Sequence, residues 1–132
     1  MNSLSNIFKI IFHFLNFTVI FFYIFPGSIM GFFLYNNIKK QPKLINDFTS
    51  DIINISSNHF YTFFVLSLFG ILSYYRKKHL NLVSIYLITI SFILEIFHVF
   101  IPNRSFQYED LFGNVLGTIF VIFIFKIWRK TT

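Results

Sequence analysis

Residues that could do chemistry are concentrated at one junction between two apolar segments, in the C-terminal third of the chain. Glu95 and His98 are three residues apart, so a helix would place both side chains on the same face. Arg104 follows in a short connection, six residues before Asp110, and we expect it to form an ion pair with one of the two carboxylates. Because an ionisable side chain is costly at membrane depth, a glutamate inside an apolar helix indicates a functional site.

The segment that begins at Asp110 has a small, polar face. Four residues fall at positions i, i+3, i+4 and i+7 and so share one side of a helix: Asp110, Gly113, Asn114 and Gly117. Gly113 and Gly117 form a small-xxx-small pair that lets a neighbouring backbone approach closely, and Asn114 could hydrogen-bond across that contact. Asp110 stands near the helix start, where its carboxylate could instead serve only to cap free N–H groups.

A Glu-x-x-His pair also raises the question of a metal. Di-iron helical bundles use two such pairs and two further glutamates, whereas this chain has one pair, with His59 and Asp110 as the remaining candidate ligands. The sequence therefore predicts no metal and no other cofactor. Acid/base catalysis is a second possibility, with Glu95 as the base and His98 or His59 as the acid. Arg104 would then stabilise an oxyanion.

The composition is that of an integral membrane protein. Of 132 residues, 55% are hydrophobic and only 12% are charged, which leaves too little polar surface for a soluble globule of this size. The net charge of +6 lies mostly beside apolar runs, where basic residues meet anionic lipid head groups, so nucleic-acid binding is not predicted. The absence of cysteine excludes disulfides, thiolate nucleophiles and cysteine metal sites.

Four apolar stretches approach the roughly 20 residues that a helix needs to cross the hydrocarbon core of a membrane. They cover residues 7–25, 59–75, 80–100 and 111–128. Because they do not alternate apolar and polar residues as barrel strands do, we predict an all-α polytopic fold, a bundle of four transmembrane helices in a single domain of residues 1–132. The link at 26–57 contains two apolar pieces too short to span, which either lie in the membrane interface or pack as loop.

The basic residues predict the orientation of the chain in the membrane. With the N-terminus in the cytoplasm, seven would lie inside and four outside, as the positive-inside rule favours. The inner seven are Lys9, Arg76, Lys77, Lys78, Lys126, Arg129 and Lys130, and the outer four are Lys39, Lys40, Lys43 and Arg104. We therefore expect a multi-pass protein of the bacterial cytoplasmic (inner) membrane, N-in and C-in, with His59 and the polar junction on the outer side.

In order and spacing, these residues resemble the VanZ-like family of small bacterial membrane proteins. The family pattern runs in outline Glu-x-x-Gln, Pro-x-Arg and Asp-x-x-x-Asn-x-x-Gly, and this chain matches it at Glu95, Pro102, Arg104, Asp110, Asn114 and Gly117. His98 replaces the usual glutamine. His59 matches the histidine of an earlier family element, in which Ile55 and Ser56 stand where a charged pair is common. The resemblance covers roughly residues 55–121 and implies a link to low-level resistance to the lipoglycopeptide teicoplanin, but no established reaction.

The sequence does not decide between binding and catalysis, and we take binding as the first expectation. A non-enzymatic envelope protein would recognise a membrane lipid or a lipid-linked cell-wall precursor at the outer leaflet, with Arg104 taking a phosphate or carboxylate and His59 and Asn114 supplying hydrogen bonds. A membrane-embedded enzyme acting on a lipid-linked substrate is the alternative. A transporter or channel ranks last, because the inner halves of the helices are almost wholly apolar. The sequence leaves the oligomeric state open.

Overall fold

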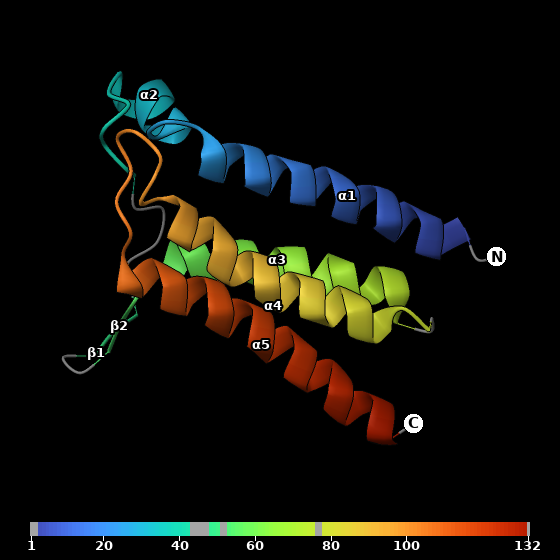
Figure 1. The fold of residues 1–132 in the computed structure, drawn as a ribbon. Helices are drawn as coiled ribbons and strands as arrows, with labels where there is room; N and C mark the ends of the chain where they lie inside the picture. Colours follow the sequence, from blue (N-terminus) through green and yellow to red (C-terminus); the bar gives the residue numbers. More distant parts are fainter. Residues whose placement is uncertain (1–2, 43–47, 51–52, 76–77, 132) are drawn as a thin grey trace.

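The computed structural model describes residues 3–42, 48–50, 53–75 and 78–131, and within them four long helices run alternately in opposite directions (Figure 1). These are α1 (Ser3–Ile24), α3 (Ser57–Tyr74), α4 (Leu80–Phe97) and α5 (Tyr108–Thr131). Both ends of the chain lie at one end of the helices, and the loop between α4 and α5 lies at the other (Figure 1). We call that other end the loop end of the bundle.

The link between α1 and α3 contains a short helix and a short hairpin. Helix α2 (Ile29–Tyr35) begins after Ser28, whose hydroxyl accepts a hydrogen bond from the Gly31 amide at 2.9 Å and so satisfies a free N–H group. Strand β1 (Phe48–Ser50) pairs antiparallel with β2 (Ile53–Ile55). Of the two apolar pieces of the link, the first is therefore a helix too short to span, whereas the described part of the second forms a hairpin that the sequence did not predict.

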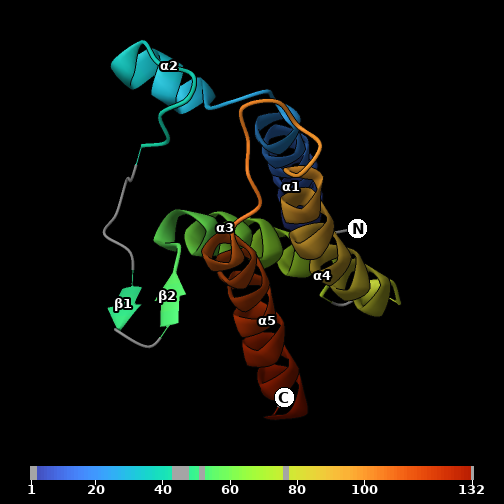
Figure 2. The ribbon, with the colours of Figure 1, turned by 60° about the vertical axis from the view of Figure 1, so that its left-hand side comes forward.

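Helix α3 is the centre of the bundle, because its contacts with the other three long helices are the most extensive. Figure 2 shows α5 crossing α3, while α1 and α4 run side by side. The core consists of buried apolar side chains from α3 and from the helices around it. Its most buried members include Phe63, Leu66 and Ile71 of α3, Leu87 of α4 and Val121 of α5.

Three helical segments, among the residues that the structure describes, are long and apolar enough to cross a membrane: Leu4–Ile24, Leu80–Phe97 and Tyr108–Arg129. The fourth expected segment, at 59–75, is present as α3 but is more polar, because its first turn is polar and because it carries the buried serines Ser67 and Ser73. The chain is thus a predominantly helical protein, and three helices of this character indicate a membrane protein.

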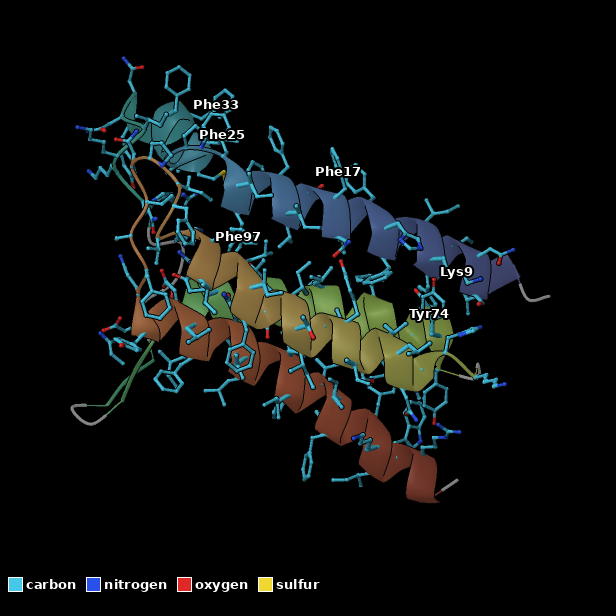
Figure 3. The ribbon with its side chains drawn as sticks, viewed as in Figure 1. Lys9, Phe17, Phe25, Phe33, Tyr74 and Phe97 are labelled. Carbon is cyan, nitrogen blue, oxygen red and sulfur yellow. The ribbon has the colours of Figure 1, made fainter. Side chains whose placement is uncertain are left out.

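The outward side of α1 is apolar, with Phe14, Phe17 and Phe21 all exposed. Figure 3 shows Phe17 pointing away from the other helices. At the end where the termini lie, the ammonium group of Lys9 is 5.6 Å from the centre of the Tyr74 ring, a cation–π distance. Such a surface suits contact with lipid chains along most of α1 and contact with lipid head groups at the end near Lys9.

The helix ends differ from the expected ones by a few residues. Helix α4 ends at Phe97 rather than at 100, because residues 98–100 form a turn, and α5 begins at Tyr108 rather than at 111. Of the basic residues counted for the orientation, Lys43, Arg76 and Lys77 lie outside the described residues.

Candidate functional site

Polar side chains from α1, α3, α4 and α5 meet inside the loop end of the bundle. The Tyr23 hydroxyl of α1 donates to Oδ1 of Asn114 in α5 at 2.8 Å, and it also lies 2.8 Å from Nδ1 of His59 in α3. The same His59 nitrogen is 3.1 Å from Asn114 Oδ1 and 3.9 Å from Oε2 of Glu95 in α4. One polar network therefore joins all four long helices.

The position of the hydrogen on His59 follows from its neighbours. Because the Tyr23 hydrogen goes to Asn114, the Tyr23 oxygen can only accept from His59, and the Asn114 oxygen is also only an acceptor. These bonds assign the hydrogen to Nδ1. In the neutral ring, Nε2 then directs a lone pair at Oδ2 of Asp110, 3.5 Å away.

Glu95 is fully buried, and its two carboxylate oxygens have different surroundings. Oε1 accepts hydrogen bonds from Nδ1 of His98 at 3.1 Å and from the backbone amide of Gln107 at 3.2 Å. Oε2, in the described part of the chain, has no hydrogen-bond partner. His98 is itself buried and stacks on the Tyr23 ring at 5.2 Å between centroids. The carboxylate is thus oriented by one oxygen, and the other is left facing His59.

Arg104 lies in the loop between α4 and α5 and makes contacts other than the predicted ones. Its Nη2 donates to the carbonyl oxygen of Phe22 at 2.8 Å, and its Nε donates to that of Phe25 at 3.5 Å. These carbonyls belong to the C-terminal end of α1, which favours a cation. The expected ion pair with Glu95 or Asp110 is therefore wrong for the described residues. Partial burial lowers the pKa of Arg104, and the guanidinium remains charged.

The two glycines of α5 lie against the backbone of α3. A Cβ atom added at Gly117 would stand 2.3 Å from the carbonyl oxygen of Phe60, and one added at Gly113 would stand 2.7 Å from that of Ser56. The added Gly113 Cβ would also be 3.0 Å from the Cβ of His59. Only glycine allows the helices to approach this closely, and the contact fixes His59 beside Asn114.

Two cavities meet at His59. A polar cavity of about 600 Å³ at the loop end is lined by amide, hydroxyl and charged side chains, among them Lys39, Asn103, Gln107 and Asp110. A mainly apolar cavity of about 300 Å³ lies between α1, α2 and α3. Its lining includes Val19, Phe22, Met30 and Arg104. His59 lines both cavities, so a single ligand could occupy the two together.

The six candidate ligand-binding residues fall into two groups. His59, Asp110 and Arg104 line the cavities. Glu95, His98 and Asn114 are buried behind them and line neither of these two cavities. Asn114, which we expected to bond a ligand, instead holds Tyr23 and His59.

Tyr23 is the member of the network that sequence reasoning missed. A tyrosine near the end of an apolar helix is typical of a membrane interface, and nothing in its position predicted a contact with a residue 91 positions away. No family model matches the chain, and neither a curated protein nor a solved structure matches it. The function must therefore be argued from the site itself.

Proposed function

We propose that this chain is a VanZ-like, four-helix protein of the bacterial cytoplasmic membrane that binds an amphiphilic ligand, a lipid or a lipid-linked cell-wall precursor, at the outer leaflet. The observation that carries the proposal is the position of His59 between a polar and an apolar cavity. A ligand that fills both needs a polar head and an apolar portion, which is the constitution of a lipid-linked molecule.

The lining of the polar cavity indicates the chemistry of the head. Amide and hydroxyl groups such as those of Asn54, Asn103 and Ser105 both donate and accept hydrogen bonds. Such a lining suits a sugar or peptide head better than a simple anion. Arg104, which lines the apolar cavity, has N–H donors beyond those used on α1 and suits a phosphate that joins head and lipid.

The four-span arrangement rests on the place of α3 in the bundle. Helix α3 is enclosed by the three apolar helices, so its serines face protein rather than lipid. Both termini lie at one end of the helices (Figure 1), which supports an even number of crossings. The excess of basic residues near that end supports N-in and C-in, which puts the site on the outer side.

Binding is favoured over catalysis by the burial of Glu95 and His98. A general base must come within hydrogen-bond reach of the substrate proton, and these two side chains line neither of the two cavities at His59. Their role in the proposal is to support His59, in keeping with the VanZ-like spacing of Glu95, Arg104 and Asp110. A contribution to teicoplanin resistance would follow from capture of a precursor and is measured by susceptibility of cells with and without the protein.

The direct test is ligand binding to protein in lipid nanodiscs. A lipid-linked disaccharide–peptide precursor should bind, and Met30→Trp, which fills the apolar cavity, should weaken binding by about tenfold, roughly 1.4 kcal/mol. Phe33→Trp, an exposed position on the same helix that does not line that cavity, is the matched control and should leave binding unchanged. Equal affinity of all three proteins, or no binding by the wild type, would refute the proposal.

A further inference from the structure

Three potential metal ligands converge where the polar network meets the polar cavity. His59 comes from α3, Glu95 from α4 and Asp110 from α5, and one ligand atom from each lies within 4.8 Å of the other two. The side chain of Glu95 is 0% exposed and that of Asp110 is 8% exposed. Two carboxylates this close and this well buried are not stable as two anions unless a proton or a cation lies between them.

Two unused acceptor atoms point into this space. Oε2 of Glu95, on a fully buried side chain, has no hydrogen-bond partner among the described residues. Nε2 of His59 directs its lone pair at Oδ2 of Asp110 without a hydrogen between them in the neutral ring. A cation that accepts lone pairs satisfies all three side chains at once.

The spacing of the ligand atoms suits a transition metal. In a tetrahedral zinc site with bonds of about 2.0–2.1 Å, two ligand atoms lie about 3.3–3.4 Å apart. His59 Nε2 and Asp110 Oδ2 are 3.5 Å apart, so these two need almost no adjustment. Glu95 Oε2 lies 3.9 Å from Nδ1, the other nitrogen of the same ring, so it would have to move toward Nε2 to complete the site.

We propose that His59, Glu95 and Asp110 bind one divalent metal ion of the zinc class, with an open coordination position that faces the polar cavity. One imidazole nitrogen with two carboxylate oxygens is a three-ligand set of the type that keeps a position free for water or a ligand. Both His59 and Asp110 line the cavity, which gives that position access. The inference goes beyond the proposed function, because metal binding requires no lipid ligand.

The surroundings hold the ligands in the orientation that a metal needs. His59 donates its Nδ1 hydrogen to oxygen atoms of Tyr23 and Asn114, which leaves Nε2 for the ion. His98 and the Gln107 amide hold Oε1 of Glu95, which leaves Oε2. Hydrogen bonds of this kind orient most protein metal ligands.

This site, which would hold one metal ion, differs from the di-iron site that the sequence argued against. The sequence lacks the second Glu-x-x-His pair of a di-iron bundle, and His98 of the single pair is not in the ligand set. His59 takes its place from another helix. The sequence analysis named His59 and Asp110 as further candidate ligands, but only the assembled helices show that these two lie with Glu95 and without His98.

The test uses full-length protein in detergent, purified with a tag that contains no histidine and stripped of metal with a chelator. Zn²⁺ added in competition with a chromophoric chelator should bind at one ion per chain with micromolar or tighter affinity. Co²⁺ should give the strong visible absorption of four- or five-coordinate cobalt. Asp110→Asn should weaken Zn²⁺ binding by about 100-fold or more.

The matched control is Glu109→Gln, which removes a neighbouring carboxylate of the same cavity from outside the ligand set and should leave the affinity within about threefold of wild type. Glu95→Gln should weaken Zn²⁺ binding as Asp110→Asn does. If the Glu95 variant does not fold, the wild type and the Asp110 variant still test the proposal. Absence of stoichiometric binding by the wild type would overturn the proposal. Equal losses in the Asp110 and Glu109 variants would also overturn it, since the ion would then sit elsewhere.

Discussion

Replacing Gly117 by alanine tests the close contact between α3 and α5. Alanine normally stabilises a helix by about 1 kcal/mol relative to glycine. At this position the new Cβ would stand 2.3 Å from the Phe60 carbonyl oxygen and 3.0 Å from the Phe64 amide nitrogen, more than 1 Å inside ordinary contact for the first. Both atoms belong to the α3 backbone, so the two helices would have to separate.

The magnitude follows from the cost of overpacking. Inserting a carbon into a tightly packed interface costs typically about 1–3 kcal/mol, because contacts along the whole interface are strained or lost. Even after the gain in helix propensity, we expect Gly117→Ala to lower the free energy of unfolding by about 1–3 kcal/mol. Gly70→Ala should stay within about 1 kcal/mol of wild type, because the atoms nearest its Cβ would be side-chain atoms of Phe12 and Leu87, at 3.0 and 3.1 Å, which yield more easily than backbone.

The assay is equilibrium unfolding by SDS in mixed micelles, followed by tryptophan fluorescence. Trp128 is the only tryptophan of the chain, and its ring stacks 5.9 Å from that of Tyr75 at the end of α3, so its emission reports whether α5 is docked on α3. If Gly117→Ala and Gly70→Ala unfold at the same SDS concentration as wild type, the α3–α5 backbone contact is not as close as described.

Three further predictions concern the network and the topology. A cysteine at Ser105 should react with a membrane-impermeant thiol reagent outside intact cells, and one at His79 should not; the chain has no cysteine of its own, so each label is unique. Tyr23→Phe should destabilise by about 1–2 kcal/mol in SDS unfolding, because it removes the hydroxyl that joins the buried Asn114 to the partly buried His59. Glu95→Gln and Arg104→Gln should be additive to within about 0.5 kcal/mol in a double-mutant cycle, because Arg104 donates to α1 rather than to Glu95.

Each of these has its own control or contrary outcome. The reverse labelling pattern would overturn the orientation and with it the outer-leaflet site. Tyr86→Phe loses a hydroxyl contact of 2.7 Å to Asn16 on the exposed surface and should cost no more than about 0.5 kcal/mol. An interaction energy above about 1 kcal/mol between the Glu95 and Arg104 changes would contradict the structure, because it would mean that the two side chains form an ion pair.

Much of the helical layout could be predicted from the sequence, because long apolar runs have few alternatives to a helix. The face that contains Gly113 and Gly117 could also be anticipated, because glycines four residues apart meet on one side of a helix. In the structure, that side of α5 lies against α3, and the two glycines are next to the α3 backbone. Spacing along the sequence was therefore enough to predict contacts within one helix and to predict which residues share a helix face.

The partners of individual side chains could not be predicted in the same way. Arg104 is close to two carboxylates along the chain, yet it bonds the end of α1, 82 residues earlier, because free carbonyls there also attract a cation. Glu95 and His98 do lie together, but the ligand set of a metal needs His59 from a third element. Such groupings depend on how helices are arranged, and no spacing in the sequence carries that information.

Because the helices are synthesised in order, the polar residues of α3 affect how the protein inserts into the membrane. Helix α1 is apolar and largely exposed, so it can enter a membrane alone. Helix α3 depends on partners made much later: Ser67 bonds Thr118, 51 residues on, and His59 bonds Asn114, 55 residues on. With four helices crossing the membrane as proposed, α3 becomes stable in lipid only when α5 arrives. Without α5, His59 and Ser67 would lose these partners, so α3 would present unpaired polar groups to the bilayer until α5 is made.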